Sequence, residues 1–145
     1  MPQPSALELA HALFAALAGR DPAEISGLFT EDCVCVDPHY PEIEMRGRAA
    51  FDRGMEWGLG SIEQFGFSIV QAFESDDRMN VAIEVDTHHV LKGGKRLDFP
   101  QVFIVEARAG HIASLRAYEP YRPNGIGGFL LRLSHIKARL AWQRR

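Results

Sequence analysis

Residues 97–121 read LDFPQVFIVEARAGHIASLRAYEPY, two β-rich runs on either side of the turn residues Ala109-Gly110. Earlier runs rich in Phe, Ile and Val are separated by Asp76-Asp77 and Gly93-Gly94, which are residue pairs typical of turns. The spacing predicts four strands in meander order, at about 62–74, 79–91, 95–108 and 111–119.

Helical signals precede these strands. Ser5 and Glu8 form a capping box, and apolar residues then recur at helical spacing until Gly19. A second helix start at Asp21, a short strand at 33–37 and a third helix at about 49–58 follow. This order predicts an α+β, cone-shaped domain, in which N-terminal helices pack on a curved, mainly antiparallel sheet.

The composition is that of a soluble globular protein. The chain has 145 residues, of which 46% are hydrophobic and 24% charged, and its formal net charge is −3. We expect one domain over 1–145, without affinity for nucleic acid. The N-terminus has no charged leader and Cys33 and Cys35 are expected to be reduced thiols, so we expect a cytoplasmic location.

The residues after 125 form a basic segment, since no acidic residue follows Glu119. Its apolar residues recur at helical spacing: Phe129, Leu133, Ile136 and Leu140. The pattern predicts an amphipathic C-terminal helical extension over 126–145. We expect it to pack as a lid or against a partner subunit rather than on a membrane surface. The convex face of the sheet also favours a homodimer.

Ionisable side chains alternate with apolar ones along the strand at 79–91. Val81, Ile83 and Val85 share one face, and the opposite face carries Ala82, Glu84, Asp86 and His88. A solvent-facing polar face would make this an ordinary half-exposed strand. A concave polar face would place two carboxylates beneath the helices, where burial raises carboxylate pKa values. The alternation alone does not decide between the two orientations.

A second cluster lies in the loop that begins Asp37-Pro38-His39-Tyr40-Pro41. Two prolines hold this loop extended, so Asp37 and His39 can project together and orient a water or move a proton. The alternative is a turn in which Asp37 caps its own backbone and His39 is solvated. No tight ligand spacing such as His-Glu-x-x-His occurs, so we expect no metal and no other cofactor.

The stretch at 97–121, the order of the helices and the Pro-rich loop before Arg46-Gly47-Arg48-Ala49-Ala50 resemble a known group of proteins. These are the SnoaL-like polyketide cyclases, limonene epoxide hydrolases and steroid isomerases of the nuclear transport factor two-like superfamily. The resemblance covers about residues 5–121 and implies a pocket for an apolar small molecule inside the cone. Such a fold hosts several chemistries as well as plain binding modules.

The resemblance also implies site positions. The epoxide hydrolases use an Arg-x-Asp pair on the second long strand, an Asp in the final strand, and a Tyr and an Asn on the loop. Counted through an ungapped closing hairpin, the pair falls on Glu84 and Asp86, and the final Asp falls on Ala117. The loop positions fall on Asp37 and His39. The loss of the water-activating Asp at Ala117 argues against epoxide hydrolysis.

We therefore expect a cofactor-independent enzyme of general acid–base type, such as an isomerase, cyclase, dehydratase or hydrolase, acting on an apolar substrate. Asp86, tuned by Glu84, is the expected acid–base carboxylate, and His39, oriented by Asp37, is its proton partner. The alternative is a non-catalytic binder of a hydrophobic ligand or a dimerisation module. The candidate substrate contacts are Trp57, His88, Phe99, Gln101, Phe103 and Leu115.

Overall fold

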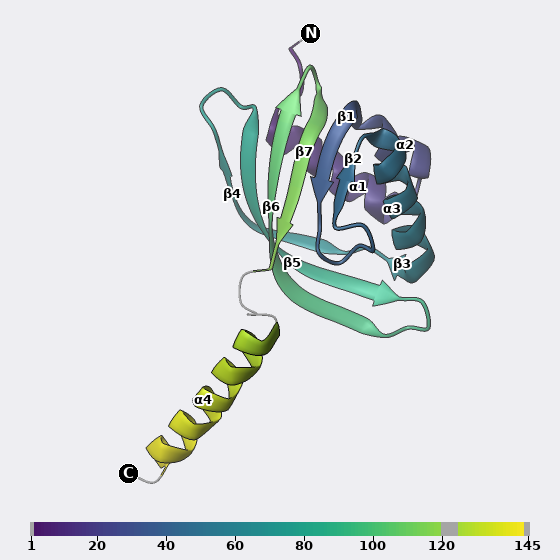
Figure 1. Cartoon of the computed structure of the whole chain (residues 1–145). Coiled ribbons are helices and arrows are strands. Elements are labelled where there is room, and N and C mark those ends of the chain that lie inside the picture. The colour runs from purple at the N-terminus through teal and green to yellow at the C-terminus, as the bar shows by residue number, and fades with distance from the viewer. Residues whose placement is uncertain (1, 120–124, 144–145) are drawn as a thin grey trace.

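The computed structural model describes residues 2–119 and 125–143, and it has the expected α+β architecture, with N-terminal helices on a strongly curved sheet (Figure 1). The elements in chain order are α1 (Ala6–Gly19), α2 (Pro22–Gly27), β1 (Phe29–Val36), β2 (Glu44–Arg46), α3 (Arg48–Ser61), β3 (Ile62–Gln64), β4 (Phe67–Glu74), β5 (Asn80–Leu91), β6 (Arg96–Arg108), β7 (His111–Tyr118) and α4 (Gly125–Gln143). Pro120 and Tyr121, the last residues of the stretch that predicts the fold, lie outside the described residues.

The sheet has the strand order β2-β1-β7-β6-β5-β3, and β4 also pairs with β5. The described ladders are antiparallel except for the parallel pair of β1 with β7. One edge of β5 pairs with β6 along its length, while the other edge pairs first with β4 and then with β3. Figure 1 shows β5 and β6 bending sharply at this change of partner, so that the sheet curls around the helices.

The strand predicted at 62–74 is divided at Phe65-Gly66 into β3 and β4. At this break the Gly66 carbonyl accepts a hydrogen bond from the His88 N–H at 2.8 Å. A Cβ atom at Gly66 would lie 2.4 Å from the His88 carbonyl oxygen, so only glycine permits this approach. The break therefore follows from a contact with β5 that the local sequence pattern does not contain.

Two further boundaries differ from the prediction. β1 begins at Phe29 rather than at residue 33, because the fully buried Phe29 ring packs on Phe51 with 4.0 Å between ring centroids. β2 lies within the predicted loop and pairs with the end of β1. Both differences arise from tertiary contacts that override weak local signals.

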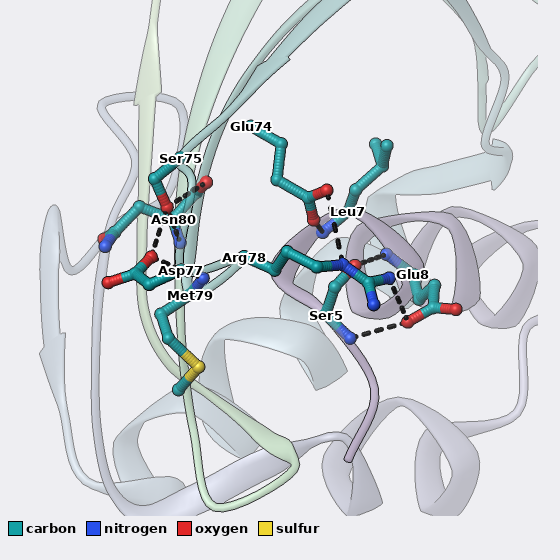
Figure 2. A network of polar contacts seen from close by, with 9 residues as sticks. All are labelled: Ser5, Leu7, Glu8, Glu74, Ser75, Asp77, Arg78, Met79 and Asn80. Atoms are coloured by element: carbon teal, nitrogen blue, oxygen red, sulfur yellow. Dashed lines mark hydrogen bonds and ion pairs between the residues drawn. The ribbon is translucent and has the colours of Figure 1, made fainter. Parts of the chain in front are cut away.

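The capping box predicted for the first helix is present at the start of α1. The Glu8 N–H donates to the Ser5 hydroxyl at 3.2 Å, and the Ser5 N–H donates to the Glu8 carboxylate at 2.7 Å. The β4–β5 turn packs against this cap: the Ala6 N–H donates to the Arg78 carbonyl at 2.9 Å. The Arg78 guanidinium lies 3.3 Å from Glu8 and 3.7 Å from Glu74 (Figure 2). These contacts fasten α1 over the concave face of the sheet.

Removing this cap tests its contribution to stability. Ser5→Ala should lower the free energy of unfolding by about 1 kcal/mol, because the Glu8 N–H in the first turn of α1 loses its acceptor. Urea denaturation followed by circular dichroism measures the change. Ser68→Ala removes an exposed hydroxyl on β4 and should cost less than about 0.5 kcal/mol. Equal losses in the two variants would contradict a specific role for the cap.

Candidate functional site

A cavity of about 220 Å³ lies between the helices and the concave face of the sheet. Its walls are largely aromatic and aliphatic, and they include Trp57 and Phe99. A narrower chamber of about 50 Å³ continues into the core and shares Leu17, Asp37 and Tyr40 with the outer cavity. A concave, mostly apolar cavity with a few polar side chains is the usual form of a small-molecule site.

Asp37 lies at the boundary between the two chambers and is only 9% exposed. Its Oδ1 atom accepts two hydrogen bonds from His39, one from the backbone N–H at 2.9 Å and one from Nδ1 at 2.8 Å. The other ring nitrogen, Nε2, lies 2.9 Å from Oε1 of Glu119. The predicted proximity of Asp37 and His39 is present. The loop is not extended as predicted, because it forms the alternative turn, in which the Asp37 side chain caps its own backbone.

The hydrogen bond to Asp37, together with the one to Glu119, raises the pKa of His39 to about 9. The imidazole is therefore protonated at neutral pH, and both of its nitrogens act as donors to carboxylates. With both nitrogens occupied, His39 acts as a fixed positive charge beside Asp37.

His89 lies in the same cavity, on β5, but its ring is neutral at pH 7. It is 8% exposed, and burial, followed by repulsion from His39, lowers its pKa to about 4. The Gly66 N–H donates to Nδ1 at 3.2 Å, which assigns the remaining proton of the neutral ring to Nε2. In the part of the chain that the structure describes, no group accepts a hydrogen bond from Nε2. His89 thus offers the cavity an unpaired neutral donor.

Gln101 and Tyr40 complete the polar lining. Gln101 is 3% exposed, and its Oε1 atom accepts a hydrogen bond from the Thr87 hydroxyl at 3.2 Å, so its amide NH₂ group is left for the cavity. Burial, and secondarily the charge of Asp37, raises the pKa of the Tyr40 phenol. Tyr40 therefore remains neutral, and its ring makes an edge contact with Trp57 at 5.6 Å between centroids.

The expected placement of Glu84 and Asp86 in the pocket is wrong. Val81, Ile83 and Val85 fill the concave face of β5, so the alternating carboxylates lie on the outer face. There Glu84 accepts a hydrogen bond from the Gln71 amide at 2.6 Å. The reason is energetic, since the covered face accommodates β-branched apolar side chains, whereas burying two carboxylates without partners is costly.

The other predicted positions divide similarly. Trp57, Phe99 and Gln101 line the outer cavity, and Phe103 and Leu115 line the inner chamber. The predicted substrate contact at His88 is wrong, because His88 lies on the outer face with Glu84 and Asp86, and its Nδ1 is 2.9 Å from Asp98. Ala117 is buried in the sheet opposite Phe103.

The sequence reasoning missed His89, Tyr40 and Glu119. The signal for His89 was present, because it has the same parity along the strand as Val81, Ile83 and Val85. Glu119 carried no local signal, since it meets His39 across 80 positions of sequence.

Within residues 2–119 and 125–143, no group of three or more His, Cys, Asp and Glu side chains is arranged to hold a metal ion. No helix in these ranges has both the length and the apolar character needed to cross a membrane.

Comparison with known proteins places the geometry in context. The SnoaL-like domain family matches residues 10–115. Among curated proteins none matches the chain. A hypothetical protein with a ketosteroid isomerase-like fold from Catenulispora acidiphila, in complex with trimethylamine, is similar in structure with a TM-score of 0.66 and 26% identity. That alignment covers 77% of this chain and 84% of the other.

Two mycobacterial structures show the same fold at lower identity. The Δ5-3-ketosteroid isomerase of Mycobacterium sp. has a TM-score of 0.72 at 18% identity, over 81% of this chain and 95% of that one. RV0760c from Mycobacterium tuberculosis, in complex with estradiol-17beta-hemisuccinate, has a TM-score of 0.71 at 18% identity over the same two shares.

The charge states of the two cavity histidines can be tested by NMR titration. His39 should titrate near pH 9 and His89 near pH 4. Asp37→Asn should bring the pKa of His39 back toward its ordinary value, and the control Asp86→Asn should leave it unchanged.

The same shifts predict how stability depends on pH. The folded pKa of His39 lies above the ordinary 6.5, so its stabilising contribution is complete below pH 6.5 and is lost as pH rises through 9. The folded pKa of His89 lies below 6.5, so the unfolded chain binds this proton first. The free energy of unfolding therefore falls as the pH drops from 6.5 through 4. A His39 resonance that titrates at 6.5 in the unmodified protein would contradict the assignment.

Proposed function

The chain belongs to the family of SnoaL-like domains, and on that basis we propose that its cavity binds a small apolar molecule with a carbonyl group and moves a proton at the adjacent carbon. The observation that carries this proposal is a buried carboxylate, Asp37, in the same apolar cavity as two neutral donors, on His89 and Gln101, for which the described residues provide no acceptor.

Asp37 is the proposed general base. Its Oδ1 atom is occupied by His39, and its Oδ2 atom has no hydrogen-bond partner among the described residues. The protonated imidazole of His39 balances the carboxylate charge and holds its orientation. Oδ2 is thus the atom that takes the proton from the substrate carbon and returns it to another carbon in an isomerisation. This assignment replaces Asp86, which lies outside the cavity.

The proposed partners of the substrate carbonyl are His89 and Gln101. Loss of a proton beside a carbonyl places negative charge on its oxygen, and fixed donors in a site that excludes water stabilise that charge. The imidazole of His89 is neutral because its pKa is low. Its Nε2–H therefore donates a hydrogen bond to the carbonyl oxygen without transferring the proton. The Gln101 amide is held by Thr87 and needs no rearrangement to donate.

The apolar walls define the rest of the substrate. Aromatic rings surround the outer cavity, and the volume of about 220 Å³ lies below the usual range for drug-sized ligands, so a compact molecule is favoured. The complex with a steroid derivative in a protein of this fold supports a largely apolar ligand.

Binding without catalysis is the second candidate. It is favoured by the two carboxylates that occupy both nitrogens of His39, because this leaves no second proton carrier in the cavity. In that case, His89 and Gln101 orient a carbonyl ligand and Asp37 remains a structural anchor for the loop.

Substitution of the base distinguishes the two candidates. Asp37→Asn should reduce kcat at least about 100-fold for the isomerisation of a compact β,γ-unsaturated ketone, because the amide cannot accept the proton. Formation of the conjugated product is followed by ultraviolet absorbance. Asp86→Asn is the matched control and should keep the activity of the unmodified protein. Full turnover by Asp37→Asn would contradict the assignment of Asp37 as the base. Binding of ketones by the unmodified protein without turnover would support the second candidate.

Removal of the donors tests carbonyl recognition separately. Gln101→Leu should lower kcat about 100-fold, because one hydrogen bond to the developing oxyanion is lost. Its affinity for a hydrocarbon of the same shape should not fall, as measured by calorimetry. His88→Gln, on the outer face, is the control. Equal losses of affinity for ketone and hydrocarbon would show that Gln101 only shapes the cavity.

A further inference from the structure

The C-terminal helix α4 has an apolar stripe that nothing in the described chain covers. Leu133, Ile136 and Leu140 recur at helical spacing and are 42%, 54% and 50% exposed. Figure 1 shows α4 extending away from the body, and no other described element packs substantially against it. Most of the stability of an amphipathic helix in a protein comes from packing of its apolar face, so α4 needs a partner surface.

A groove between α2 and α3 offers a surface of complementary character. Its volume is about 620 Å³ and it is open to solvent. Pro22 and Ala23 of α2 face Met55 and Leu59 of α3, which gives the groove an apolar floor. This groove lies outside the cone and shares only Met55 with the inner chamber of the cavity.

The charges of the groove and the helix are opposite. Asp52 and Glu56 line the α3 side of the groove, and none of the lining residues is basic. The sequence of α4 contains Lys137 and Arg139, together with Arg132, and no acidic residue. At 100° per residue, Lys137 and Arg139 fall on opposite flanks of the apolar stripe. Either direction of α4 in the groove therefore brings a cation to the acidic wall.

The groove residues of α3 run from Asp52 to Leu59, which is about two turns of helix. The part of the α4 stripe whose side chains the structure describes, from Leu133 to Leu140, can therefore lie along this part of the groove. An amphipathic helix in a groove is a recurrent mode of recognition, in which apolar side chains anchor the helix and flanking charges select it.

We propose that α4 of one copy of this chain docks in the α2–α3 groove of a second copy. The second copy is favoured over the chain's own groove, because α4 extends away from the body that carries α2 and α3 (Figure 1). The contact is separate from the cavity chemistry and does not depend on the proposed function.

Sedimentation velocity of the full chain tests the pairing of charges. Lys137→Glu with Arg139→Glu should raise the dissociation constant of self-association at least about tenfold, because like charges then meet in the groove. Adding Asp52→Lys and Glu56→Lys to the same chain should restore association. Lys92→Glu with Lys95→Glu changes the net charge equally on the β5–β6 turn and should have no effect. Failure of the charge exchange to restore association would overturn the proposal.

Cross-linking then locates the contact. A Glu56→Cys copy mixed with a differently tagged Lys137→Cys copy should form a disulfide-linked pair on mild oxidation. Glu106→Cys, on the outer face of β6, should not link to Lys137→Cys. Linkage within a single Glu56→Cys, Lys137→Cys chain that stays monomeric would overturn the proposal in favour of the chain's own α4. So would a monomeric protein whose α4 binds anionic phospholipid vesicles.

Discussion

Strand β5 forms ladders with β3, β4 and β6, so its pleat fixes which face of the neighbouring strands points into the cone. The odd-numbered residues from Val81 to Val85 fill the core, and the same parity buries Thr87 and carries His89 into the cavity. A shift of one residue would bury Glu84 and Asp86 and expose the apolar set. The packing of Val81, Ile83 and Val85 in the core thus determines that His89, rather than Glu84 or Asp86, faces the cavity.

The charge distribution in the cavity follows from how each group is desolvated. His39 remains half-exposed and touches two carboxylates, so ion pairing outweighs the cost of burial and its pKa rises. His89 has no carboxylate partner and is surrounded by aromatic rings, so burial dominates and its pKa falls. Two identical side chains in one cavity therefore carry different charges, and each acts as a donor for a different reason.

The parts of the fold that the sequence predicted are those encoded locally. The Ser5 capping box, the turn pairs and the periodicity of α4 each lie within a few residues, and each appears in the structure. The break at Gly66 and the Glu119 contact depend on long-range packing, which no local pattern contains. The misplaced carboxylates arose from counting residues through an ungapped hairpin. A one-residue error in such a count exchanges the two faces of a strand.

The proposed chemistry places a further demand on the ligand, because the polar groups of the cavity all lie near its outer chamber. Asp37 stands at the boundary, His89 and Gln101 line the outer side, and the inner chamber beyond is almost entirely apolar. A ligand with its carbonyl toward His89 therefore directs its apolar end either inward or toward the mouth beside Trp57. The inner chamber of about 50 Å³ admits only a small group, so the bulk of a larger substrate must lie toward the mouth. Hydrogen bonds in the outer cavity thus set the position of the ligand's carbonyl, and the small inner chamber limits where its apolar part can lie.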